Sequence, residues 1–146
     1  MKTVIAIDPG NEKTGIALVR EDDSLIEKRI VPTETLAYEV EKIFLLHNNR
    51  TADTIDAIVC GNGTNHKKLY PLVQQVAIRL GVKTFLIKEA YTTEEGRKRY
   101  WQYEPPKGIR RFVPISFQSP PRPVDDYTAW IIGERYFRGE IDDQKK

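Results

Sequence analysis

The sequence predicts an α/β domain built on a mixed five-stranded sheet with flanking helices, and two observations support this. Three segments that read as strands come first and are joined by short turns, which indicates an antiparallel meander because parallel neighbours need long crossovers. Further along the chain, segments whose apolar residues recur with the period of a helix alternate with short apolar segments typical of strands. Such alternation is typical of parallel strands joined by helical crossovers. We expect the whole chain, residues 1–146, to form one domain.

The expected elements follow one another without an internal repeat. The first strand alternates along TVIAID and ends at Asp8-Pro9-Gly10. Further strands are expected at 15–20, 24–31, 55–60 and 83–88, and helices at 35–47, 69–80, 92–100 and 124–137. Thr92 and Glu95 fit a capping box at the start of the third helix. Six prolines exclude a long regular helix within the segment from about 100 to 123, which we interpret as a basic and aromatic loop insertion, and residues 138–146 are expected to form a flexible tail.

The composition limits the class of protein. Hydrophobic residues make up 40% and charged residues 30% of the chain, and the apolar runs are too short to cross a membrane. The first ten residues lack the apolar stretch of a signal peptide. Cys60 is the single cysteine, so an internal disulfide or a cysteine-rich zinc site is excluded, and its place in AIVCG predicts a buried, inert thiol. We therefore expect a cytoplasmic protein with no membrane partner.

Three carboxylates stand where α/β sheets usually carry their chemistry, at the carboxyl ends of strands or facing them. Asp8 closes the first strand, Glu89 closes the fifth, and Asp125 opens the last helix. Clustered carboxylates repel one another and need cations, and hard oxygen ligands suit Mg²⁺ or Mn²⁺. Two such ions about 3.5–4 Å apart activate water and stabilise the leaving oxygen of a phosphodiester. Taken singly, each acid has a structural interpretation as well: a turn, a solvated strand end or a helix N-cap.

The beginning of the chain resembles a known nuclease hairpin. In the segment IAIDPGNEKTGIALV, Asp8, Gly10 and Gly15 take the positions of an aspartate, a turn glycine and a strand glycine. This order resembles the first hairpin of the RuvC and YqgF branches of the RNase H-like superfamily. Sugar kinases and actin-like ATPases use a similar turn on phosphate, so this hairpin alone does not decide between them.

Three later segments resemble the YqgF branch, which includes nucleases called RuvX. In LIKEAYTTEEGR, the catalytic glutamate of that family and the Thr pair that follows it correspond to Glu89, Thr92 and Thr93. In VDDYTAWIIGERYF, the catalytic aspartate corresponds to Asp125, with Asp126 as the alternative if the register is shifted by one residue. The strand IDAIVCGNGTN fits the family as well. Three features differ from the family pattern: Ala90 replaces an arginine, Gly61-Asn62-Gly63 replaces Gly-Leu-Pro, and the loop before the last helix is longer and richer in proline and aromatic residues.

The resemblance covers nearly the whole chain except about residues 100–123, and it has specific implications. It implies an RNase H-like fold and a divalent-metal-dependent nuclease, either a processing enzyme for pre-16S rRNA, hence of ribosome biogenesis, or a Holliday-junction-resolvase-like enzyme. The catalytic and metal-binding acids would be Asp8, Glu89 and Asp125, with Mg²⁺ or Mn²⁺ and two ions expected. The substrate would be RNA or branched DNA, and the enzyme a monomer or a homodimer.

A basic and aromatic stretch points to the same class of partner. Between Arg97 and Arg122 there are seven basic residues and one acid, Glu104. Cations neutralise phosphates, and aromatic faces stack on unpaired bases. A surface loop whose aromatic residues fold back on the core is the alternative. The nucleic-acid contacts that we predict are Asn65, Lys67, Lys68, Arg97, Lys98, Arg99, Trp101, Arg110 and Arg111.

Two other functions are compatible with parts of the sequence. The first is a catalytically inactive nucleic-acid-binding module that kept the fold, because Ala90 and the Gly-Asn-Gly segment depart from the nuclease pattern. The second is a fragment of an actin-like sugar kinase, suggested by Asp8-Pro9-Gly10. The length argues against a kinase, since that architecture needs two such domains, and no P-loop is present.

Overall fold

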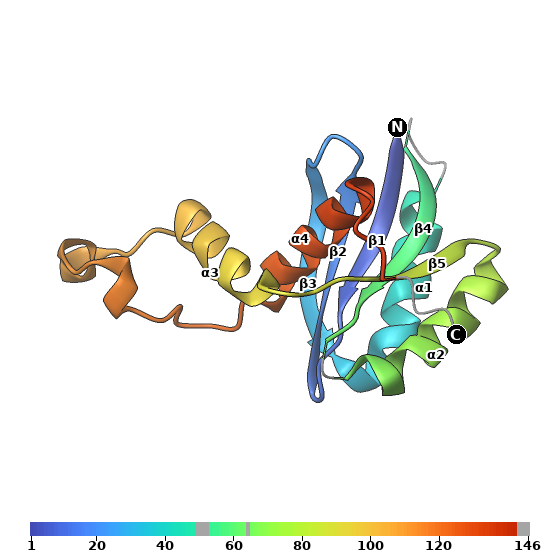
Figure 1. Cartoon of the computed structure of the whole chain (residues 1–146), viewed down its shortest axis with the longest axis horizontal. Helices are drawn as coiled ribbons and strands as arrows, with labels where there is room; N and C mark the ends of the chain where they lie inside the picture. The colour runs from blue at the N-terminus through green and yellow to red at the C-terminus, as the bar shows by residue number, and fades with distance from the viewer. Residues whose placement is uncertain (49–52, 64, 143–146) are drawn as a thin grey trace.

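The computed structural model describes residues 1–48, 53–63 and 65–142. Its centre is a five-stranded sheet with the order β3-β2-β1-β4-β5 (Figure 1). β1 pairs antiparallel with β2 and parallel with β4, so the predicted mixed sheet is confirmed. The strands are β1 (Lys2–Asp8), β2 (Lys13–Arg20), β3 (Leu25–Pro32), β4 (Thr54–Gly61) and β5 (Lys83–Ile87).

Helices cover both faces of this sheet. Helices α1 and α2 pack on one face, α4 packs on the other, and α3 extends from the α4 side away from the sheet (Figure 1). No helix in the described ranges is long and apolar enough to span a membrane. The α-helices are α1 (Leu36–His47), α2 (His66–Leu80), α3 (Thr92–Tyr103) and α4 (Asp125–Phe137), and the short 3-10 helices are η1 (Thr33–Thr35), η2 (Gly108–Phe112) and η3 (Ile115–Phe117).

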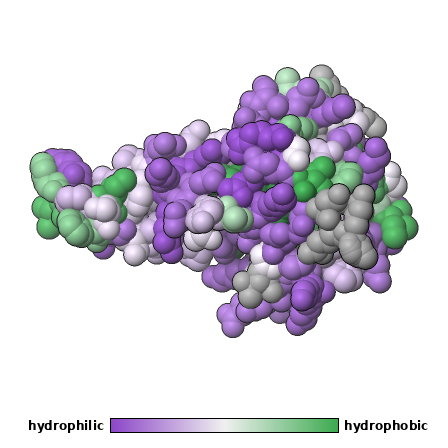
Figure 2. Space-filling view, viewed as in Figure 1, coloured by the Kyte–Doolittle hydropathy of each residue, from purple (hydrophilic) through white to green (hydrophobic). Residues whose placement is uncertain are grey.

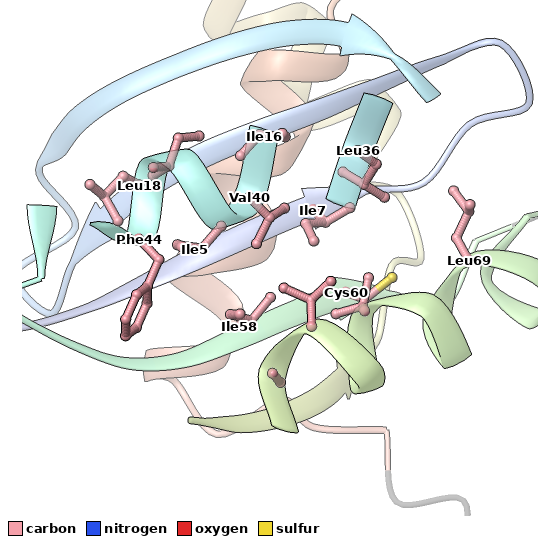
Figure 3. Close-up of a cluster of buried hydrophobic side chains, with 14 of the residues drawn as sticks. Ile5, Ile7, Ile16, Leu18, Leu36, Val40, Phe44, Ile58, Cys60 and Leu69 are labelled. Carbon is pink, nitrogen blue, oxygen red and sulfur yellow. The ribbon is translucent and has the colours of Figure 1, made fainter. Parts of the chain in front are cut away.

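The alternation of side chains along β1 divides the core into two layers. Ile5 and Ile7 point toward α1 and α2, where they join a cluster of buried aliphatic residues (Figure 3). Val4 and Ala6 point to the opposite face and pack with residues of α4. Because successive side chains of a strand alternate between faces, Asp8 follows Val4 and Ala6 onto the α4 face. The strand period therefore brings this carboxylate to the side of the sheet on which α4 begins.

Glycine and alanine let α4 approach the sheet closely. A Cβ atom on Gly133 would lie 2.7 Å from Val19 Cγ2 and 3.4 Å from Ala6 Cβ. At the start of the same helix, a Cβ atom on Gly15 would lie 2.0 Å from the backbone oxygen of Asp125. Real atoms cannot be that close, so both glycines are required by packing. The result is a helix that is buried along most of its length, with its first turn held against β2.

The structure corrects the expected start of α3. Thr92 does not cap the helix with Glu95; its hydroxyl donates instead to the Glu89 carbonyl oxygen at 2.8 Å. Tyr91 occupies the N-cap position in a left-handed conformation, with φ of 65°. Glu95 is used elsewhere, because it accepts from the buried Arg135 at 2.6 Å. Tertiary ion pairing thus takes the side chain that a local capping box would need. The helix also continues to Tyr103, three residues beyond the expected end.

The start of the expected tail is fixed to the sheet. Ile141 forms an antiparallel bridge with Ile87. Asp142 accepts a hydrogen bond from the Asn62 side-chain nitrogen at 2.7 Å. Residues 138–142 are therefore ordered by contacts with β5 and with the loop after β4, contrary to the expectation. The rest of that tail, residues 143–146, lies outside the described residues.

Candidate functional site

Asp8 ends the central strand of the sheet. Its strand neighbours are β2, where it pairs with Gly15, and β4. Burial and, to a smaller extent, the negative charges of Glu89 and Asp125 raise the pKa of its carboxyl group from an ordinary value of 3.8 to about 8. The three acids predicted from the sequence thus lie close enough to interact electrostatically. A carboxylate in this position is unfavourable unless a positive charge accompanies it.

The Glu89 side chain lies between two glycines, Gly61 at the end of β4 and Gly63 in the loop that follows. A Cβ atom on Gly61 would lie 2.0 Å from Glu89 Oε1, and one on Gly63 would lie 2.1 Å from Glu89 Oε2. The residue between them holds the backbone, because the Glu89 amide donates to Asn62 Oδ1 at 3.0 Å. In this chain, the two glycines of the Gly61-Asn62-Gly63 segment therefore leave space for the Glu89 side chain, and Asn62 positions the Glu89 backbone.

The environment of the Glu89 carboxylate is only partly satisfied. Its Oε1 atom is buried and has no hydrogen-bond partner among the residues that the structure describes. Burial raises the pKa of Glu89, and Asp125 adds to this, while a backbone hydrogen bond from Gly63 and the charges of His66 and Arg135 act in the opposite direction. A buried carboxylate oxygen without a donor is costly, so this atom is a candidate ligand for a cation.

Asp125 is the first residue of α4 and lies within electrostatic range of Asp8 and Glu89, whereas Asp126 is engaged in ion pairs. Burial raises the pKa of Asp125, Asp126 raises it further, and Lys13 lowers it. Asp126 is only 4% exposed and accepts from Lys28 Nζ at 2.7 Å and from Arg122 Nη1 at 3.3 Å. Since two cations already neutralise Asp126, the structure favours Asp125 as the third acid of the site.

Asparagine substitutions at these two neighbouring positions are expected to have different effects on stability. Asp126→Asn should lower the free energy of unfolding by about 2 kcal/mol, because the largely buried Lys28 loses its carboxylate partner. Asp125→Asn should cost nothing or should stabilise the protein in EDTA, because burial disfavours its charged form. Urea unfolding of both variants checks this. Equal losses of stability would contradict the assignment of the two aspartates.

Hydrogen bonds order the loop that follows Asp8. The Gly10 carbonyl oxygen accepts from Asn65 Nδ2 at 2.9 Å and from Thr33 Oγ1 at 3.0 Å. Asn65, predicted as a nucleic-acid contact, therefore fastens the start of α2 to this loop. Lys67 and Lys68, in the first turn of α2, are exposed. These two lysines face solvent, where they can contact a phosphate backbone, whereas the Asn65 side chain is already hydrogen-bonded to Gly10.

The predicted basic contacts on α3 have different environments. Arg97 and Lys98 are exposed. Arg99 donates to Glu134 Oε2 at 2.6 Å, and its guanidinium lies 4.6 Å from the Trp130 ring centroid, so it packs against α4. Arg99 is consequently a structural residue, which the sequence pattern did not distinguish from its neighbours.

The remaining predicted contacts lie at and beyond the end of α3. Trp101 is half-buried, and its ring meets Tyr100 edge to face. Arg110 and Arg111 are exposed on a segment that projects away from the sheet (Figure 1). The structure therefore brings the three acids within electrostatic range of one another, whereas Arg110 and Arg111 lie on a segment that projects away from the sheet.

The donor chemistry of the acid site fits a hard divalent cation. Among the residues that the structure describes, no three His, Cys, Asp or Glu side chains are close enough to one another to form a metal-binding group. The electrostatic coupling of Asp8 with Glu89 and Asp125, and the buried Glu89 Oε1 atom, are nevertheless what such a cation would relieve. These three acids are the residues that could hold it.

Sequence reasoning missed three residues that shape the site. Asn62 positions Glu89, Lys13 lies near Asp125, and the buried Arg135 donates to the Lys88 carbonyl oxygen at 2.9 Å beside Glu89. Arg135 of α4 therefore brings a positive charge near Glu89, and it also forms an ion pair with Glu95. Only Asn62 had a signal, as a polar residue between two glycines at a strand end.

The sheet order and the helices on its two faces define an RNase H-like fold. No protein-family model and no curated protein sequence matches this chain. Its fold is similar to that of Thermus thermophilus RuvC in complex with a Holliday junction substrate, with a TM-score of 0.60, 16% identity, and coverage of 97% of this chain and 99% of that one. It is also similar to the Fowlpox virus resolvase in complex with Holliday junction DNA, with a TM-score of 0.62, 10% identity, and coverage of 94% and 97%.

Proposed function

We propose that this protein is a divalent-metal-dependent nuclease that hydrolyses phosphodiester bonds of structured nucleic acid. The observation that carries the proposal is the electrostatic interaction of Asp8, Glu89 and Asp125 at one end of an RNase H-like sheet, each with a raised pKa. Two of the solved structures with a similar fold are complexes with Holliday junctions. Both supports point to phosphodiester chemistry, since clustered carboxylates at strand ends suit metal-assisted hydrolysis.

Different residues of this chain would have different roles in such a site. Asp8, Glu89 and Asp125 would hold Mg²⁺ or Mn²⁺, which when bound supplies charge neutralisation and water activation at the phosphodiester. The Gly61 and Gly63 positions keep the Glu89 carboxylate in place. Lys13, near Asp125 and exposed at the start of β2, is placed to meet a phosphate. No side chain needs to form a covalent bond with the substrate.

The test is cleavage of a labelled four-way DNA junction and of a labelled single-stranded RNA, in Mn²⁺ or in EDTA. Wild type should cut in Mn²⁺ only, and Asp8→Asn should lose more than about a hundredfold in rate, since even residues behind metal ligands are worth about 10–100-fold. Asp22→Asn, in the exposed β2–β3 turn, is the matched control and should cut normally.

Either substrate would establish the nuclease, and the preferred one would name its branch. Cleavage of the junction favours resolution, which requires two sites related by a two-fold axis and hence a dimer. Cleavage of RNA favours a role in rRNA processing of the YqgF type. Binding without cleavage, unchanged by Asp8→Asn, would overturn the proposal and leave an inactive nucleic-acid-binding module. The absence of a converged metal-binding group among the described residues is the observation that favours this second candidate.

A further inference from the structure

Residues 104–121, which we name the arm, carry apolar side chains into solvent. The arm begins where α3 ends and projects far from the sheet (Figure 1). Ile109 is 84% exposed, Phe112 76% and Phe117 80%, and Val113 and Ile115 are exposed as well. Figure 2 shows these hydrophobic residues gathered at the far end of the molecule. Soluble proteins seldom leave such a group uncovered unless it meets a partner.

The arm has a defined shape. The Gln118 side-chain nitrogen donates to the carbonyl oxygens of Arg110 and Val113, each at 2.9 Å, and so fastens η2 to the residues after η3. Backbone bonds close both turns, from Val113 to Arg110 and from Phe117 to Pro114. Its prolines restrict the backbone further. The exposed rings are therefore held outward by the local structure of the arm.

The charge of the arm specifies the partner. The arm contains three basic residues, Lys107, Arg110 and Arg111, and one acid, Glu104, which accepts hydrogen bonds from Arg122 and Tyr127. The Arg111 guanidinium lies 4.9 Å from the centre of the Phe112 ring, so a cation and an aromatic face occur together at the tip. A second copy of this chain or a neutral apolar protein would not need this excess of cations. A polyanion with exposed planar groups uses both features, and unpaired nucleotides are of this kind.

Two hollows in the arm strengthen this interpretation. One of about 380 Å³ is lined by residues that include Trp101, Tyr103 and Lys107 at the base of the arm. The other, of about 350 Å³, is lined by residues that include Phe117 near the tip. Arg110 borders both hollows. Aromatic and basic side chains line both hollows, and such a lining suits the bases and phosphates of a nucleic-acid strand.

We propose that the arm binds unpaired nucleotides of the same substrate at a distance from the acid site, with Phe112 and Phe117 stacking on bases and with Lys107, Arg110 and Arg111 holding phosphates. This inference rests on the proposed function, because the arm and the acids would engage the same nucleic acid. It makes the arm the part that distinguishes branched or looped substrates from a continuous duplex. A regular duplex keeps its bases stacked and offers the rings nothing to contact.

The test measures binding in EDTA, so that it does not depend on cleavage. The probes are a 20-base-pair duplex and the same duplex with a three-nucleotide bulge that contains 2-aminopurine, whose fluorescence changes on stacking. Wild type should bind the bulged probe about tenfold more tightly and quench its fluorescence. The double variant Phe112→Ala, Phe117→Ala should lose both the preference and the quenching. Ile78→Ala, which removes an equally exposed apolar side chain on α2, is the matched control.

Further variants and measurements separate stacking from other roles of the arm. Phe112→Leu with Phe117→Leu keeps the apolar surface without the rings and should lose the quenching. Arg110→Gln should weaken binding to both probes and reduce its salt dependence. The proposal would be overturned if wild type and the double alanine variant bound the two probes with the same affinity. It would also be overturned if sedimentation showed a dimeric wild type and a monomeric variant while the binding of both probes was unchanged. Cleavage in Mn²⁺, measured separately, tells whether the acid site is active even if the arm is not a nucleotide site.

Discussion

Asp8→Asn is expected to make the protein more stable in EDTA, by about 2 kcal/mol or more at neutral pH, while it abolishes cleavage. The reason is that folding places this carboxyl group in a buried position beside two other acids, which raises its pKa to about 8. A tenfold change in a protonation equilibrium corresponds to about 1.4 kcal/mol, so a negative charge at this position costs the folded state several kcal/mol of stability. Removing or neutralising the charge removes this cost. Asparagine keeps the shape of the side chain and carries no charge.

The same group predicts how stability depends on pH. Between the ordinary pKa of 3.8 and the folded value of about 8, the folded state holds a proton that the unfolded state has released. The stability of wild type should therefore fall as the pH rises through this interval, and part of that slope should be missing in Asp8→Asn. Urea unfolding of both proteins in EDTA at about pH 5 and about pH 8 measures the difference. A constant gap between the two proteins at both pH values would contradict the assignment.

Metal binding should reverse the order of the two proteins. A cation that binds only the folded state stabilises it in proportion to the logarithm of its concentration. Mn²⁺ should therefore raise the melting temperature of wild type, and it should raise that of Asp8→Asn much less. This readout does not require a substrate. An equal shift in both proteins would show that Mn²⁺ binds elsewhere.

The second large effect is expected at two glycines that contact acids of the site. Gly15→Ala should lower the free energy of unfolding by about 3 kcal/mol, because the new Cβ atom would lie 2.0 Å from the backbone oxygen of Asp125 and α4 would have to move. Gly63→Ala should leave the fold intact, because the atom that its Cβ meets is at the end of the flexible Glu89 side chain. It should still abolish most of the cleavage by displacing that carboxylate.

Thermal unfolding and cleavage in Mn²⁺, measured on the same preparations, distinguish the two glycine variants. Gly15→Ala should show a large fall in melting temperature, whereas Gly63→Ala should melt close to wild type and cut poorly. Normal cleavage by Gly63→Ala would show that the position of the Glu89 carboxylate between the two glycines is not needed for activity. A wild-type melting temperature for Gly15→Ala would show that the first turn of α4 does not pack on β2 as described.

Local patterns in the sequence determined the strands and the regular helices. The apolar run of residues 4–7 and the helical period of residues 36–47 reflect which side chains must be buried, and this information is carried by neighbouring residues. The mixed sheet followed from the lengths of the connections. The three acids were found because each stands at the end of a strand or the beginning of a helix, where the order of residues alone marks the place.

Tertiary structure decided how individual side chains are used. Arg99 and Arg97 are indistinguishable in sequence, yet Glu134 and Trp130 hold only Arg99, because they lie on a helix that follows much later in the chain. Glu95 is likewise taken by Arg135 rather than by the capping box that its spacing suggested. Partners distant in sequence compete with local ones, and only the folded chain decides between them.

In the acid site, too, the sequence determined some features and the tertiary structure decided others. The sequence by itself determined that Asp8, Glu89 and an aspartate at 125 or 126 are the acids to consider. Only the tertiary structure separated the two aspartates, since Lys28 of β3 and Arg122 neutralise Asp126 and leave Asp125 to face Asp8. It also showed why glycines flank Asn62. The physical reason is that burial and charge neutralisation are properties of all the atoms around a group, and these atoms come from segments that the sequence does not place beside one another.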